Sequence, residues 1–117
     1  MNGYVTTYVV YVLFLEREVV YVGQTTDYNA RIKQHVYQRQ WDFSRRLSVR
    51  TINEALALEG CLVRLLRPSG NKCDSPSYIK NAKHYPVVMG HHISRLRYLF
   101  RSIGCDGLLS DALTLPR

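Results

Sequence analysis

The sequence predicts an α/β fold, an α+β sandwich in which helices flank a small, mainly antiparallel sheet of three strands. Two observations predict it. Short runs of β-branched and aromatic residues alternate with longer segments of helix formers, and 117 residues suffice for one domain around a single core. The expected order of elements is β-β-α-β-α, followed by a C-terminal helical tail.

The first two strands are expected to form a hairpin. Residues 8–15 (YVVYVLFL) are apolar throughout, which is typical of a central strand covered on both faces. Residues 19–23 (VVYVG) form the second run, which Gly23 is expected to end. The polar residues 16–18 (ERE) between them predict a short loop.

A helix and a third strand follow the hairpin. Residues 24–27 (QTTD) are polar and suited to cap a helix, and residues 28–40 contain few helix breakers. Residues 43–49 (FSRRLSV) then carry Ser and Arg among Phe, Leu and Val. We therefore expect a helix over residues 28–40 and a short strand over residues 43–49.

The second long helix has the clearest boundaries. Thr51 and Glu54 match the capping-box pattern, residues 55–66 are rich in Ala and Leu, and residues 68–71 (PSGN) stop the helix. Residues 92–101 (HISRLRYLFR) predict another, basic helix after a loop.

The domain organisation is simple. Residues 1–103 are expected to form one domain whose core spans residues 8–71, and residues 104–117 to form a partly disordered tail.

Charge and cysteine content limit the class of protein. The chain carries 16 Lys+Arg against 9 Asp+Glu, a net charge of +7, so a polyanionic partner is expected, with DNA favoured. No basic amphipathic helix with a bulky apolar face is evident, so no membrane partner is expected. Three scattered cysteines favour a reducing compartment, hence a cytoplasmic or nucleoid-associated protein that is not secreted.

Glu59 interrupts an apolar helix face. At about 100° per residue it falls among six aliphatic residues, while four others form the opposite face. The aliphatic set is Ile52, Ala55, Leu56, Leu62, Val63 and Leu66, and the opposite set is Asn53, Glu54, Ala57 and Arg64. A half-buried carboxylate requires a strong partner, either an arginine or a hard cation such as Mg²⁺. A structural ion pair, or a side chain that reaches water, would explain the pattern equally.

Arg31 and His35 form a second candidate pair. They lie four residues apart and so share one face of the first helix. A guanidinium that holds a phosphate beside an imidazole that moves protons suits phosphoryl chemistry. A solvated polar face is the simpler alternative.

The hairpin register brings two tyrosines together. If the loop has three residues, Leu15 pairs with Val19 and Tyr11 pairs with Gly23. Tyr11 and Tyr21 then lie diagonally on one face of the sheet, near enough to share a site. Aromatic packing within the sheet explains most of the nine tyrosines as well.

The order and spacing of these residues resemble the GIY-YIG nuclease family. Residues 10–11 (VY) and residues 21–23 (YVG), with nine residues between them, look like its paired motif. The first motif lacks the family's usual glycine and isoleucine, and the second has Val22 for isoleucine, but the tyrosines are kept. No separate DNA-binding module follows, which puts sequence specificity in doubt.

The rest of the resemblance covers the chain as far as Asn71. Arg31 lies eight residues after Gly23 with His35 one turn further, as in the family's helical motif. Glu59 resembles the metal-binding glutamate, and Asn71 the asparagine that often closes the core.

The resemblance implies a Mg²⁺-dependent DNA endonuclease in which Mn²⁺ substitutes. Glu59 would hold the metal and Arg31 the scissile phosphate. Tyr11 would act as base toward water, His35 would accept or relay its proton, and Tyr21 would position water or phosphate.

Supporting roles follow for other residues. Gly23 and Asn71 would support the site structurally. Eight basic residues would contact the DNA backbone, although each alone is typical of a solvated surface: Arg45, Arg46, Arg50, Lys80, Lys83, Arg95, Arg97 and Arg101.

Double-strand cleavage would require a homodimer or two encounters, because one active site cuts one strand. Residues 98–100 and 108–109 are apolar enough for a dimer contact, and equally for packing within the monomer.

Three functions remain open. The first is an endonuclease of a restriction, mobile-element or repair type. The second is a nucleic-acid-binding protein of the same fold with little activity, or a subunit that requires a partner. The third, a small basic scaffold protein, leaves Glu59 unexplained.

Overall fold

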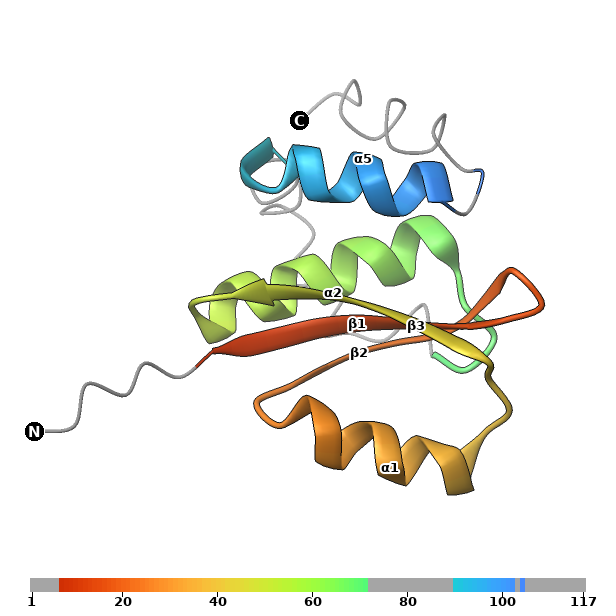
Figure 1. Ribbon diagram of the computed structural model, residues 1–117. Coiled ribbons are helices and arrows are strands. Elements are labelled where there is room, and N and C mark those ends of the chain that lie inside the picture. The colour runs from red at the N-terminus through yellow and green to blue at the C-terminus, as the bar shows by residue number, and fades with distance from the viewer. Residues whose placement is uncertain (1–6, 72–89, 103, 105–117) are drawn as a thin grey trace, which may run out of the picture.

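The protein is an α+β sandwich built on a three-stranded antiparallel sheet in the order β2-β1-β3 (Figure 1). The computed structural model describes residues 7–71, 90–102 and 104. Its elements are β1 (Tyr8–Leu15), β2 (Glu18–Thr25), α1 (Tyr28–Gln38), β3 (Phe43–Val49), α2 (Ile52–Leu66) and α5 (Ile93–Ser102). The fold class and the order of elements predicted from the sequence are confirmed. Most of the loop predicted over residues 72–90 (residues 72–89) and most of the tail predicted over residues 104–117 (residues 105–117) lie outside the described residues.

The central strand β1 is covered on both faces, as its unbroken apolar sequence predicts. Val10, Val12 and Phe14 pack into the main core with α2 and α5. Tyr11 and Leu13 alternate with them and are fully buried on the other face, which α1 covers (Figure 1). The main core therefore fills one side of the sheet, and the other side holds Tyr11, for which the family resemblance predicts a catalytic role.

The hairpin has the predicted pairing at Tyr11 but a different turn. Tyr11 pairs with Gly23 as expected, whereas Leu15 pairs with Glu18 and not with Val19. The turn has two residues, Glu16 and Arg17, at φ 52° and 72°. Positive φ at both central residues is the geometry of two-residue hairpin turns, because its twist matches that of the strands.

A bulge in β2 restores the expected register. The pairing shifts between Leu13 and Phe14, so Val20 is the extra residue on the partner strand. The shorter turn and the bulge cancel, which keeps Tyr11 opposite Gly23. The prediction that Gly23 ends β2 is wrong, because the strand continues to Thr25.

Helix α1 begins at the predicted cap and ends two residues early. Asp27 is the N-cap, and its side chain accepts a hydrogen bond from the Ala30 amide at 3.1 Å. The helix ends at Gln38, not at Gln40, because Arg39 is extended at φ −158°. Strand β3 has the predicted bounds.

Helix α2 lies between the sheet and α5 (Figure 1), so its buried face is wider than the sequence predicted. Ala57, expected on the polar face, is only 3% exposed, whereas Ile52, expected on the apolar face, is 40% exposed. A helix covered on two sides buries a wider stripe than a sheet alone would require. Arg67, in the left-handed region at φ 46°, ends the helix just before the predicted stop.

Helix α5 packs onto α2 through an apolar face and through a series of polar contacts. Leu96, Leu99 and Phe100 are buried in the main core. The second of the two segments considered for a dimer contact, residues 108–109, lies outside the described residues. In the first segment, residues 98–100, Tyr98 is exposed, whereas Leu99 and Phe100 are buried in the core of the monomer.

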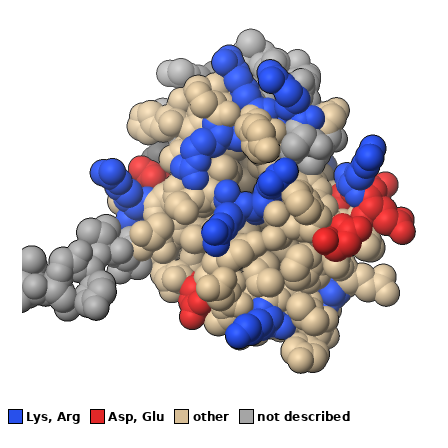
Figure 2. Space-filling model, viewed as in Figure 1, with Lys and Arg blue, Asp and Glu red and all other residues tan. Residues whose placement is uncertain are grey.

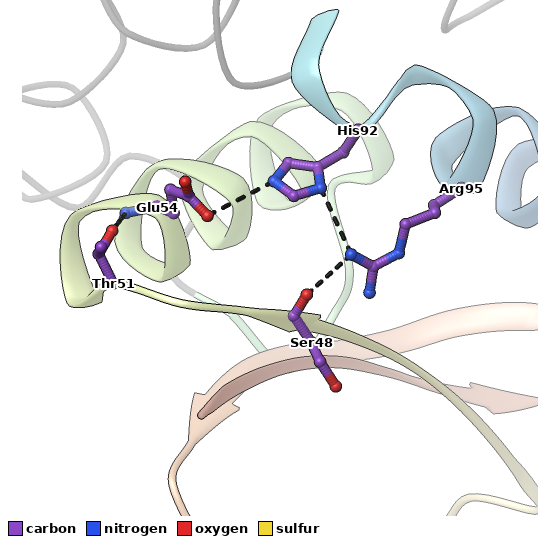
Figure 3. Close-up of polar contacts among 5 residues, drawn as sticks. All are labelled: Ser48, Thr51, Glu54, His92 and Arg95. Atoms are coloured by element: carbon purple, nitrogen blue, oxygen red, sulfur yellow. Dashed lines mark hydrogen bonds and ion pairs between the residues drawn. The ribbon is translucent and has the colours of Figure 1, made fainter. Parts of the chain in front are cut away.

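The polar contacts join α2, α5 and β3 (Figure 3). Thr51 Oγ1 accepts from the Glu54 amide at 3.1 Å, which forms half of the predicted capping box. The Glu54 carboxylate turns instead toward His92, at 3.7 Å. Arg95 donates to the Ser48 carbonyl at 2.7 Å and contacts His92 Nδ1 at 3.4 Å. These contacts fix α5 beside strand β3.

Candidate active site

The hairpin places two tyrosines on the α1 face of the sheet. The rings of Tyr11 and Tyr21 lie 6.1 Å apart between centroids, diagonal to one another across β1 and β2. The register expected from the sequence therefore brings these two residues together.

Gly23 makes room for the Tyr11 phenol. A Cβ at position 23 would lie 2.5 Å from Tyr11 Oη and 2.8 Å from Tyr21 Cε2. Paired residues on adjacent strands share a face, so any side chain here would occupy the space of the phenol. The absence of a side chain at Gly23 therefore leaves the space that the Tyr11 phenol occupies.

Substitution Gly23→Ala should displace the Tyr11 hydroxyl from its partners. We expect a loss of about 1–3 kcal/mol in stability from overpacking, together with loss of any activity that depends on Tyr11. Chemical denaturation and a cleavage assay measure the two effects. Gly90→Ala is the matched control, because a Cβ at position 90 has open space around it. A Gly23→Ala protein with unchanged activity would contradict this role.

Helix α1 supplies Arg31 and His35 to the same cluster. His35 is only 1% exposed on a helix whose other side chains are mostly exposed, because its ring packs against Tyr11 and Tyr21 at 5.4 and 4.9 Å. Tyr11 Oη lies 2.7 Å from His35 Nε2, and Arg31 Nε donates to the same oxygen at 3.4 Å. The predicted pair on one helix face therefore converges on a single phenol oxygen.

Arg39 is a member of the cluster that the sequence did not indicate. Its Nε donates to His35 Nδ1 at 3.1 Å, and its guanidinium lies over the Tyr21 ring at 3.9 Å. It stands four residues after His35, the same spacing that joins Arg31 to His35. This four-residue spacing was visible in the sequence. The helix was expected to continue to residue 40, however, so Arg39 was not recognised as the residue at its end.

The hydrogen bond from Arg39 determines the tautomer of His35. An arginine Nε can only donate, so Nδ1 must be the accepting nitrogen of the imidazole. Burial, then the charges of Arg39 and Arg31, lower the pKa of His35 to about 4, so the ring is neutral near pH 7. A neutral ring that accepts at Nδ1 carries its proton on Nε2. His35 Nε2 therefore donates to Tyr11 Oη.

Tyr11 thus accepts two hydrogen bonds, from His35 and from Arg31. Burial raises the pKa of the phenol to about 12, and the charge of Glu59 adds to the rise, while the hydrogen bond from Arg31 opposes it. With two donors on the oxygen, the phenolic hydrogen must point away from both. The two donors would stabilise a phenolate, but burial outweighs them, so the raised pKa keeps the Tyr11 phenol protonated near pH 7.

Glu59 is partly buried on α2, as expected. Burial raises its pKa to about 7, and Arg31 opposes the rise. Within residues 7–71, 90–102 and 104, no side chain or amide forms a hydrogen bond or ion pair with this carboxylate. The charge of Glu59 raises the pKa of Tyr11, and the charge of Arg31 lowers the pKa of Glu59, so the carboxylate lies within electrostatic range of both groups. The structural ion pair considered above is therefore not formed in that part of the chain.

The Glu59 carboxylate fits a Mg²⁺ ion that is held by few protein ligands, and not a site built from several protein side chains. The described residues contain no group of three or more His, Cys, Asp or Glu side chains placed to hold an ion. Mg²⁺ is commonly bound by one or two carboxylates together with water and substrate phosphate oxygens. A single carboxylate without a hydrogen-bonding partner in the described residues, within electrostatic range of Arg31, matches that mode of binding.

Asn71 supports the site from the free edge of β2. Its side-chain amide donates to the Val22 carbonyl and its oxygen accepts from the Val22 amide, each at 2.8 Å. The Gly70 amide donates to the Val20 carbonyl at 2.8 Å. The segment after α2 is thereby fixed along the outer edge of β2, beside the strand that carries Tyr21.

The predicted DNA contacts separate into three groups. Arg45, Arg46 and Arg95 line a cavity beside β3. Arg50, Arg97 and Arg101 are exposed after β3 and along α5. Lys80 and Lys83 lie outside the described residues. Figure 2 shows that basic side chains on this face gather over the sheet and α5, while the acidic ones lie toward its margins.

Comparison with protein-family models, curated proteins and solved structures finds no match to this chain. Among the described residues, no helix combines the length and the apolar character needed to cross a lipid bilayer. The function is therefore inferred from the residues of the candidate site.

Proposed function

We propose that the chain is a metal-dependent DNA endonuclease of the GIY-YIG type, which hydrolyses phosphodiester bonds. The observation that carries the proposal is the convergence of Arg31 and His35 on the Tyr11 hydroxyl, with the Glu59 carboxylate within electrostatic range of Tyr11 and Arg31. The Tyr11 phenol oxygen accepts hydrogen bonds from His35 and from Arg31. The half-buried Glu59 carboxylate, which has no hydrogen-bonding partner among the described residues, acts electrostatically on this phenol. The family resemblance and the net charge of +7 agree with this proposal.

Each side chain then has a defined task. Glu59 holds a divalent cation, and Arg31 contacts the scissile phosphate and offsets charge that develops on it. Tyr11, as the phenolate, takes the proton of the attacking water while the bond from phosphorus to the leaving oxygen breaks. A bound Mg²⁺ would neutralise the phosphate, stabilise the leaving oxygen and reverse the effect of Glu59 on the Tyr11 pKa.

His35 acts as a donor in this scheme. Its Nε2 proton stabilises the phenolate of Tyr11, and Arg39 holds the ring in the tautomer that permits this. Acceptance of the Tyr11 proton by His35, expected from the sequence, would require the other tautomer and loss of the Arg39 hydrogen bond. Tyr21 packs between Arg39 and His35 and keeps both side chains in place.

Replacement of Arg39 tests this positioning role. Arg39→Met removes the donor and the charge, so the pKa of His35 should rise from about 4, while burial still holds it below 6.5. We expect cleavage to fall about tenfold near pH 7, since general acid–base groups contribute about 10²–10⁴ and only their orientation is lost. NMR titration of the imidazole and a pH–rate profile measure the two effects.

Arg64→Met is the control for Arg39→Met, because Arg64 is exposed on α2. A purely structural role for Arg39 would lower stability and leave the His35 titration unchanged, which would contradict the assignment.

Nicking of supercoiled plasmid DNA tests the proposed function itself. The wild type should convert closed circles to open circles in Mg²⁺ or Mn²⁺ and be inactive in EDTA. Folded protein that binds plasmid and branched DNA without cutting either would favour the nucleic-acid-binding alternative.

A further inference from the structure

A basic cavity lies at the free edge of β3, between the start of α1 and α5. Its volume is about 550 Å³, and its lining includes Arg45 and Arg46 of β3 and Arg95 of α5. Among the described residues, no acidic side chain lines it. Three guanidinium groups around one cavity create a positive potential that suits an anion.

Arg45, which lines this cavity, has one unsatisfied donor. Its Nε is buried and has no hydrogen-bond partner among the described residues. The rings of Phe43 and Tyr98, 4.5 and 5.5 Å from the guanidinium carbon, restrict its position. Nε itself is enclosed, so an anion in the cavity would be bound through the terminal guanidinium nitrogens of Arg45, which are not enclosed, by charge-assisted hydrogen bonds.

Arg46 links the cavity to the catalytic tyrosine. It pairs directly with Tyr11 across β1 and β3, so the two side chains share the α1 face of the sheet. Its guanidinium lies 4.8 Å from the Tyr28 ring, and Tyr28 in turn meets Tyr11 edge-on at 6.0 Å. The cavity is therefore next to the site, on the side of β3.

The neighbouring residue Arg45 projects toward the opposite face of the sheet, and Arg95 reaches β3 from that side, where it donates to the Ser48 carbonyl. The arginines therefore surround the edge of β3 from both faces. An anionic chain that crosses this edge would meet Arg46 first and then Arg45 and Arg95.

We propose that this cavity is a phosphate subsite of the DNA strand, which holds a phosphodiester group adjacent to the scissile one. The inference rests on the proposed function only in taking DNA as the substrate. The subsite binds backbone phosphate and so positions the strand without selecting sequence.

Binding of a labelled DNA duplex without metal tests the subsite. All variants carry Glu59→Gln, are measured in EDTA by fluorescence anisotropy, and are titrated over a range of NaCl concentrations. The double change Arg45→Gln with Arg46→Gln should weaken binding about tenfold or more and reduce the slope of log K against log salt by about 1–2. Arg45→Lys with Arg46→Lys should keep that slope, because lysine contacts phosphate as a point charge.

Arg64→Gln on the exposed side of α2 is the matched control and should bind as the parent does. Thermal unfolding confirms that each variant is folded. An unchanged affinity and salt slope in the double glutamine variant would overturn the subsite, even if plasmid nicking by the wild type is observed. Loss of binding with no nicking by the wild type would support the subsite and reject the nuclease.

Discussion

Substitution Glu59→Gln is expected to raise thermal stability at pH 8 and to abolish DNA cleavage. The pKa of Glu59 is raised from its ordinary value of 4.5 to about 7 in the folded protein, by burial first of all. Between these values the folded state binds more protons than the unfolded chain, so this group lowers stability as the pH rises. The penalty is fully present above about pH 7 and absent below about pH 4.5.

Glutamine has the shape of the protonated acid and carries no charge, so it removes that penalty. We expect roughly 2 kcal/mol of added stability at pH 8, or a rise in Tm of roughly 5–10 °C, and little difference at pH 4.5. Cleavage should fall at least about 1000-fold, because a metal ligand supplies several kcal/mol of transition-state stabilisation. Differential scanning calorimetry and nicking rates measure the two effects.

Glu54→Gln on the same helix is the matched control. Its carboxylate faces His92, away from the tyrosine cluster, so activity should be unchanged. A Glu59→Gln protein that is less stable than the wild type at pH 8 would show that the carboxylate has a stabilising partner, and would contradict its role as a metal ligand.

Substitution Tyr11→Phe is expected to reduce cleavage by about 10²–10⁴ while the ring packing is preserved. The phenylalanine ring keeps the contacts with Tyr21, Tyr28 and His35, and only the oxygen that accepts from Arg31 and His35 is lost. Single-turnover cleavage, with circular dichroism as a check on folding, measures the effect.

The pH dependence separates a base from a merely structural tyrosine. Glu59 must lose its proton to hold metal, so wild-type activity should fall below about pH 7. Above that pH the rate should continue to rise, because the raised pKa of Tyr11 keeps the phenolate scarce. Tyr11→Phe should lose the alkaline rise, and Tyr8→Phe, on the same strand but outside the cluster, should retain it. Wild-type activity in Tyr11→Phe would place the base elsewhere.

The sequence predicted the elements because their signals are local. The apolar run of β1, the cap at Asp27 and the pairing of Tyr11 with Gly23 depend on neighbours along the chain or across one turn. The two-residue turn and the bulge at Val20 were not predicted, since twist and strand pairing select them together. The extra buried face of α2 was missed because it depends on α5, which is distant in sequence.

The sequence predicted that Tyr11, Arg31 and His35 lie close together, and the structure has them in contact, but the hydrogen bonds between them were not predicted. Tyr11, Arg31 and His35 were identified, yet the direction of the hydrogen bond at His35 depends on Arg39, whose position follows from where α1 ends. The difference between Arg45 and Arg46 likewise required the sheet register, which places adjacent arginines on opposite faces. Spacing indicates which residues can meet, and tertiary packing determines which atom faces which.

The rate of plasmid nicking by the wild type and by Glu59→Gln, in the same Mg²⁺ buffer and after both proteins are shown to be folded, tests the central claim most directly. We expect metal-dependent nicking by the wild type and a loss of at least about 1000-fold in the variant, with DNA binding retained. Equal nicking by both proteins would contradict the role of Glu59, and the absence of nicking by the wild type would contradict the nuclease.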